Sequence, residues 1–209
     1  SLKQDTGAKA DDFVTSVGTL SLTGVETGAA VEYSIDGGKT WTGSFTAAEG
    51  KNSVQVRQTD VAGNVSAATT LGFTLDTKAA APGVTLAQDT GAKADDFVTS
   101  VGTLSLTGVE TGAVVEYSID GGKTWTGSFT AAEGKNSVQV RQTDVAGNVS
   151  AATTLVFTLD TTAAAPGVSL KQDTGAKADD FVTSVGTLSL TGVETGAAVE
   201  YSIDGGKTW

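Results

Sequence analysis

The aspartates of this chain are grouped in short loop segments, in a way that could serve a hard cation. Within the segment 89–96, Asp89, Asp95 and Asp96 supply three carboxylates, and a second segment reads Asp144-Val145-Ala146-Gly147-Asn148. Ca²⁺ takes about six to eight oxygen ligands from carboxylates, carbonyls and water, and these segments offer such oxygens without nitrogen or sulfur ligands. Aspartate also favours turns, because its side chain bonds to its own backbone. Spacing alone leaves both interpretations open.

These groups recur because the sequence repeats with a period of 84 residues. Residues 1–84 and 85–168 differ at five positions, and residues 169–209 match residues 1–41 without a difference. Repetition is not independent support, because a duplicated sequence duplicates accidents too. The candidate calcium ligands are Asp5, Asp11, Asp12, Asp60 and Asp76 in the first unit, Asp89, Asp95, Asp96, Asp144 and Asp160 in the second, and Asp173, Asp179 and Asp180 in the third.

The composition argues against several other functions. The chain has no histidine, cysteine or methionine, so it lacks the usual general base near neutral pH, a thiol nucleophile and disulfides. With 13 basic against 24 acidic residues its net charge is −11, which disfavours nucleic-acid binding. No apolar run approaches the roughly 20 residues that span a bilayer, so we expect no membrane insertion. No set of residues suggests catalysis, and we expect that the protein is not an enzyme.

The elements that carry the aspartates are predicted to be strands. Apolar residues alternate with polar ones in short runs bounded by Gly, Asp, Asn or Thr, which is typical of antiparallel strands with one face in water. In the second unit we predict strands at 84–88, 101–108, 114–119, 124–129, 137–143 and 151–159, with a further short one near residue 130. About seven strands at this spacing predict an all-β fold of antiparallel β-sandwiches.

The apolar positions of these runs define the expected core of the second unit. It comprises Leu104, Leu106, Val115, Tyr117, Ile119, Trp125, Phe129, Val138, Val140, Leu155, Phe157 and Leu159. This set suffices for a small domain.

The two prolines, Pro82 and Pro166, mark the boundaries between units. Proline ends strands and biases the residue before it to extended geometry, so short extended linkers are expected around both. The predicted organisation is repeat 1 at 1–76, a linker at 77–83, repeat 2 at 84–160, a linker at 161–167, and a truncated repeat 3 at 168–209.

The segment from Ser34 to Trp41, Ser-Ile-Asp-Gly-Gly-Lys-Thr-Trp, resembles the Asp-box of sialidases and other β-proteins. In those families it forms a hairpin away from the catalytic centre. A sialidase would also need an arginine cluster, and Arg57 and Arg141 are the only arginines in the chain. We therefore predict a structural hairpin with glycines at its turn.

Four motifs of the 84-residue unit together resemble the bacterial immunoglobulin-like repeats of giant surface adhesins exported by type I secretion systems. They are Leu-Asp-Thr-x-Ala-Ala-Ala-Pro, Asp-Thr-Gly-x-x-x-x-Asp, Tyr-Ser-x-Asp-Gly-Gly-x-Thr-Trp and Val-Arg-Gln-Thr-Asp-x-Ala-Gly-Asn-Val-Ser. The resemblance spans essentially the whole chain. It implies tandem Ig-like β-sandwich domains, an extracellular location on the bacterial surface, calcium at or near domain junctions, and a role in attachment or biofilm formation.

Ig-like connectivity predicts where the carboxylates meet. With the termini at opposite ends of a sandwich, Asp5, Asp11 and Asp12 of repeat 1 face the junction from one side and Asp144 of repeat 2 from the other. Asp76 opens the linker between them. These five carboxylates would repel one another unless a cation lay among them.

Two functions are consistent with these features. One is a calcium-stiffened extender of a surface adhesin, whose partners are the neighbouring repeats while other regions of the parent protein bind the host or surface ligand. The alternative is an Ig-like binding module that recognises a glycan or protein through an exposed sheet face. Near-identity of the repeats favours the extender, because one copy would suffice for a binding face.

Overall fold

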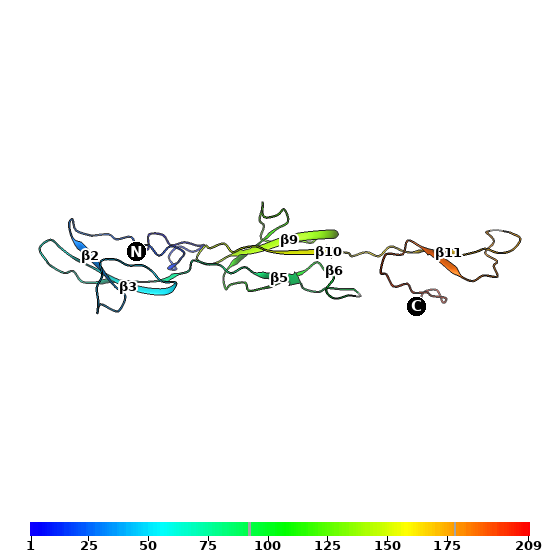
Figure 1. The fold of residues 1–209 in the computed structure, drawn as a ribbon, viewed down its shortest axis with the longest axis horizontal. Coiled ribbons are helices and arrows are strands. Elements are labelled where there is room, and N and C mark those ends of the chain that lie inside the picture. Colours follow the sequence, from blue (N-terminus) through cyan, green and yellow to red (C-terminus); the bar gives the residue numbers. More distant parts are fainter. Residues whose placement is uncertain (92, 178) are drawn as a thin grey trace. The chain divides into compact units, whose positions relative to one another are not determined.

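The computed structural model describes residues 1–91, 93–177 and 179–209, and throughout these ranges the chain forms strands, turns and loops without a helix. The all-β prediction is confirmed (Figure 1). None of the described residues belongs to a helix that could cross a membrane. The chain divides into two compact units, residues 1–160 and residues 161–209, and the first of them contains repeats 1 and 2.

Repeat 1 is built on one four-stranded sheet with the order β1-β4-β3-β2. The strands are β1 (Val14–Thr15), β2 (Ala30–Ser34), β3 (Gly50–Thr59) and β4 (Thr69–Leu75). A bridge between Leu2 and Leu20 pairs the two segments that pack against this sheet. Val54, Phe73 and Leu75 are buried between the two layers.

Repeat 2 has the same large sheet, in the order β6-β10-β9-β8, and a second sheet of two strands. The large sheet contains β6 (Val98–Thr99), β8 (Val114–Ser118), β9 (Gly134–Thr143) and β10 (Thr153–Leu159), and the small one pairs β5 (Gly83–Leu86) with β7 (Leu104–Thr107). The core between the sheets is formed by Val84, Val138, Val140, Leu155, Phe157 and Leu159. Alternate residues of β9 and β10 supply most of this core, as expected from the period-two pattern.

The prediction of antiparallel pairing throughout is wrong at one edge of each large sheet. β1 pairs with β4, and β6 with β10, in parallel. The sequence pattern predicts neither of these two-residue strands. β5 pairs with β7 in the small sheet. From the end of β5 the chain crosses to the large sheet, where β6 runs beside β10, the last strand of the repeat, in the same direction. A segment that changes sheets can pair in parallel without a crossover helix.

Four details of the predicted sandwich are wrong because the turn after β8 is longer than the pattern suggested. Residues 124–129 contain only an isolated bridge between Thr126 and Tyr117, and no strand lies near residue 130 among the described residues. Ile119 lies in this turn and is 73% exposed. Trp125 is half-buried outside the core, where the Arg141 guanidinium lies 4.0 Å from the centre of its ring. Arg141 belongs to the outer face of β9, so Trp125 covers that face.

The residues between the repeats contribute to the core of repeat 2. Pro82 and Val84 are buried, and Gly83 begins β5. Val140 and Gln142 are fully buried beside this segment, whereas their counterparts Val56 and Gln58 in repeat 1 are only partly buried. Because the flanking sequences are nearly identical, the difference comes from the neighbouring segment rather than from the residues themselves.

The unit 161–209 has little buried surface. It contains one pair of strands, β11 (Gly167–Leu170) and β12 (Leu188–Thr191), and none of its described residues is buried. Val168 is exposed, although its counterpart Val84 lies in the core of repeat 2.

The segment Ser34–Trp41 forms a tight turn, as predicted. The Asp36 carboxylate accepts hydrogen bonds from the Thr40 hydroxyl at 2.6 Å, from the Ser34 hydroxyl at 2.7 Å, and from the amides of Lys39 and Thr40 at 2.9 Å. Asp120 accepts the same set in repeat 2. Trp41 donates its indole N–H to the Gly38 carbonyl, which places the ring against the turn.

This turn predicts a pH dependence of stability. Hydrogen bonds from the threonine hydroxyl and amide lower the pKa of Asp36 and of Asp120 from 3.8 to about 2. A lowered carboxyl pKa stabilises the folded state above pH 3.8, and that contribution is lost as the pH falls towards about 2. We expect the melting temperature to fall over this range, and to fall less steeply in the variant Asp36→Asn/Asp120→Asn. Equal slopes for the variant and the wild type would contradict this expectation.

Candidate metal centre

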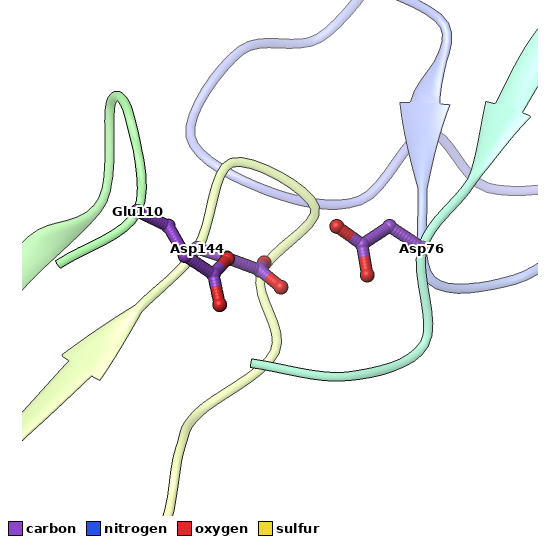
Figure 2. Close-up of side chains that lie close together, drawn as sticks. All are labelled: Asp76, Glu110 and Asp144. Carbon is purple, nitrogen blue, oxygen red and sulfur yellow. The ribbon is translucent and has the colours of Figure 1, made fainter. Parts of the chain in front are cut away.

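Three carboxylates meet where repeat 1 passes into repeat 2. One oxygen each of Asp76, Glu110 and Asp144 lies within 4.8 Å of the others. Asp76 follows β4, Glu110 lies between β7 and β8, and Asp144 follows β9. Figure 2 shows the carboxylates of Glu110 and Asp144 side by side, with that of Asp76 facing them from the end of repeat 1. The cluster therefore draws on both repeats.

Asp144 is held by its own turn. Its Oδ1 accepts the Asn148 amide at 2.8 Å, its Oδ2 accepts Asn148 Nδ2 at 2.7 Å, and the residue is only 5% exposed. The same Nδ2 also donates to the Asp76 carbonyl at 2.8 Å. Asn148 thus connects the Asp144 turn of repeat 2 to the end of repeat 1.

Glu110 is positioned by the buried side chain of Gln142. The Glu110 amide donates to Gln142 Oε1 at 2.8 Å, and Gln142 Nε2 donates to the carbonyls of Ala80 at 2.7 Å and Gly108 at 3.0 Å. The Glu110 carboxylate in turn accepts the Ala80 amide at 2.7 Å. The segment between the repeats and the Glu110 loop are therefore fixed to each other.

The charges of this cluster are all negative. The ion pairs found among the described residues join Arg57 to Glu32 and Arg141 to Glu116, away from the three carboxylates. Negative charges this close repel one another unless a cation lies among them. The donors are hard carboxylate oxygens, which suit Ca²⁺ and Mg²⁺ rather than the softer transition metals. This donor set fits calcium, whose remaining ligands would come from carbonyls or water.

The structure brings two of the predicted ligands, Asp76 and Asp144, into the cluster. Asp60 occupies the equivalent turn of repeat 1, where its carboxylate accepts Asn64 Nδ2 and the amides of Ala62 and Asn64. The Asn64 side chain is the main cause of the lowered pKa of Asp60. Asp160 follows β10 and donates its amide to the Thr99 carbonyl at 2.9 Å. Neither Asp60 nor Asp160 belongs to the three-carboxylate cluster.

The remaining predicted ligands organise the corresponding loop near the start of each repeat. Asp5 Oδ2 accepts the amides of Asp11 and Phe13, and Asp12 Oδ1 accepts the Val14 amide. Asp11 has a φ of 77°, a conformation that L-residues rarely adopt. The same hydrogen bonds recur at Asp89, Asp95 and Asp96 in repeat 2 and at Asp173, Asp179 and Asp180 in the unit 161–209.

The loop of repeat 1 does reach repeat 2, as the predicted connectivity required, but it does so through Thr6 and Gly7. The oxygens Oδ1 of Asp5, Asp89 and Asp173 are buried and have no hydrogen-bond partner among the described residues. The three-carboxylate cluster does not include Asp5, Asp11 or Asp12.

Sequence reasoning missed Glu110. Its segment, Val-Glu-Thr-Gly, recurs unchanged around Glu26 and Glu194, and nothing in the letters distinguishes the three copies. The available signal was topological: the loop between β7 and β8 lies at the same end of the sandwich as the Asp144 turn. Counting strand directions would have placed it there.

The fold and the acidic site define tandem β-sandwiches that share a charged junction. The bacterial Ig-like domain model matches residues 1–77 and again residues 78–161. The chain therefore belongs to the bacterial Ig-like domain family, and the prediction of tandem Ig-like sandwiches is confirmed.

Beyond the family model, the chain shows a distant structural similarity to a known protein. No curated protein matches the sequence. Among solved structures, the chain is similar to the fibronectin(III)-like modules of CbhA from Clostridium thermocellum, with 16% identity and a TM-score of 0.33 over 62% of this chain and 76% of that one.

Proposed function

We propose that this chain is an extender of a bacterial surface protein and that calcium stabilises the junction between its first two repeats. The observation that carries the proposal is the meeting of Asp76, Glu110 and Asp144 at the point where one repeat passes into the next. A cation bound there would contact both repeats at once. Its binding free energy would therefore oppose their separation.

An extender needs stiffness, because the reach of a flexible string of domains grows only as about the square root of its length. Bridging carboxylates of two repeats restricts the angle between them. Near-identity of the repeats supports this role, since a spacer gains length from every copy. Export by a type I secretion system and a role in attachment or biofilm formation belong to the same proposal.

The proposed affinity suits an extracellular site. Extracellular calcium modules bind with a dissociation constant of about 10⁻⁴–10⁻³ M, so such a site fills outside the cell and stays empty at cytosolic calcium. The acidic net charge of −11 keeps the chain soluble and favours cations over anions.

The test is calcium titration by calorimetry together with thermal melting, in calcium and in chelator. We expect calcium to raise the stability of the wild type by about 2.7 kcal/mol at a hundredfold excess over the dissociation constant. Glu110→Gln should reduce this gain strongly, because glutamine can still accept the Ala80 amide but carries no charge. The matched control is Glu26→Gln, which changes the corresponding exposed residue of repeat 1 and should bind as the wild type does.

A melting temperature that is indifferent to calcium in the wild type would contradict the proposal. If Glu110→Gln and Glu26→Gln reduced the calcium-induced gain in stability equally, the assignment of the site to the junction would be contradicted.

A further inference from the structure

A second contact between the repeats lies beside the acidic cluster and uses no charge. The corner Thr6–Gly7 of repeat 1 packs against the turn Val145–Gly147 of repeat 2. Thr6 Oγ1 donates a hydrogen bond of 2.6 Å to the Ala146 carbonyl. Thr6 Oγ1 also accepts the Ser16 amide at 2.7 Å, so its own repeat holds it in position.

The closeness of the two backbones leaves no room for a side chain at Gly7 and little room at Gly147. Gly7 has a φ of +99°, and a side-chain carbon there would overlap the carbonyl oxygen of Val145. Gly147 has a φ of +88°, and a side-chain carbon there would lie 3.0 Å from the Gly7 nitrogen. The two main chains therefore touch directly.

The counterparts of these residues in the other repeat make no such contact among the described residues, so the contact depends on the adjoining repeat and not on the local sequence. Gly91, the counterpart of Gly7, has a φ of +106°, and a side-chain carbon there would have no atom of the described residues within 4 Å. Val61, the counterpart of Val145, is 82% exposed, whereas Val145 is 38% exposed. Ala146 is fully buried beneath the corner.

The segment between the repeats is tied on both sides. Thr77 donates its amide at 3.0 Å and its hydroxyl at 2.9 Å to the Glu49 carboxylate of repeat 1. Ala80 exchanges hydrogen bonds with Glu110 and Gln142 of repeat 2. These contacts are direct hydrogen bonds and do not require an ion.

We infer that the Thr6–Gly7 corner and the Val145–Gly147 turn form a docking surface that fixes the orientation of the two repeats with or without a cation. The surface fits one kind of partner, the Val-Ala-Gly turn of a following repeat with this sequence. Calcium then adds stability to an orientation that the backbone contact has already set. This goes beyond the proposed calcium role, because the two contacts can fail independently.

The chain has no cysteine, so Lys51→Cys and Lys135→Cys provide a single spin-label pair, one exposed label on each repeat at corresponding positions. Pulsed electron paramagnetic resonance then measures the distribution of the distance between the repeats. We expect a narrow distribution in both calcium and chelator. In Gly7→Ala it should broaden by about twofold or more under both conditions, because a close-packed contact has no room for a methyl group.

Gly91→Ala is the matched control. It imposes the same strain of a positive φ on alanine, but the added methyl group meets no described residue within 4 Å, so its distance distribution should remain narrow. Similar melting temperatures of the two variants would show that both are folded. Equal widths for Gly7→Ala and Gly91→Ala would overturn the inference.

A wild-type distribution that broadens in chelator as much as Gly7→Ala does would also overturn it, and would leave the calcium proposal standing. Failure of the chain to bind calcium, with the Gly7→Ala effect intact, would refute the calcium proposal alone.

Discussion

Replacing Phe157 with alanine is expected to lower the free energy of unfolding of repeat 2 by about 3–5 kcal/mol. Phe157 is 2% exposed and lies among Val138, Val140 and Leu155 between the two sheets. Its ring also packs edge-on against that of Phe129, with the two ring centres 6.4 Å apart. Removing it leaves a cavity that the sheets cannot close without breaking their pairing. Urea denaturation followed by circular dichroism measures the loss.

Trp125→Ala is the comparison that tests the corrected core. Trp125 is partly exposed on the outer face, so its truncation should cost less than half as much as that of Phe157, although tryptophan is larger. A loss at Trp125 that equals or exceeds the loss at Phe157 would contradict the placement of these two rings.

Gln142→Ala is expected to cost about 2–4 kcal/mol, because removing a buried side chain leaves its partners unsatisfied. Gln142 is fully buried and satisfies the Glu110 amide and the carbonyls of Ala80 and Gly108. The variant should also bind calcium more weakly, since Gln142 positions the Glu110 loop. Calorimetry with and without calcium measures both effects.

The control is Gln58→Ala at the corresponding position of repeat 1. Gln58 bonds to Glu26 and Gly24 but is partly exposed, so water can replace its side chain at a cost of about 1 kcal/mol. Calcium binding should be unchanged in this variant. Equal costs at the two glutamines would show that the segment between the repeats adds nothing to repeat 2.

Local pattern was sufficient for the fold class. The alternation around Val138, Val140, Leu155 and Phe157 places one face of each strand in a core, and glycine-rich segments separate the strands. The pattern failed at Ile119 and Trp125, which continue the alternation in letters but lie in or beyond a turn held by Asp120. Hydrogen bonds of that turn outweighed the periodicity.

The sequence by itself determined that this protein is a tandem array of small β-domains, because alternation and the repeat are properties of neighbouring letters. Only the tertiary structure decided which copy of an identical segment becomes a site. Asp144 and Asp60 have the same flanking residues, and each closes its own turn with an asparagine side chain. Only Asp144 is also buried and lies close to Glu110 and Asp76. The Asp144 turn lies against the end of repeat 1, and burial, charge proximity and backbone contact all depend on which surfaces meet in space.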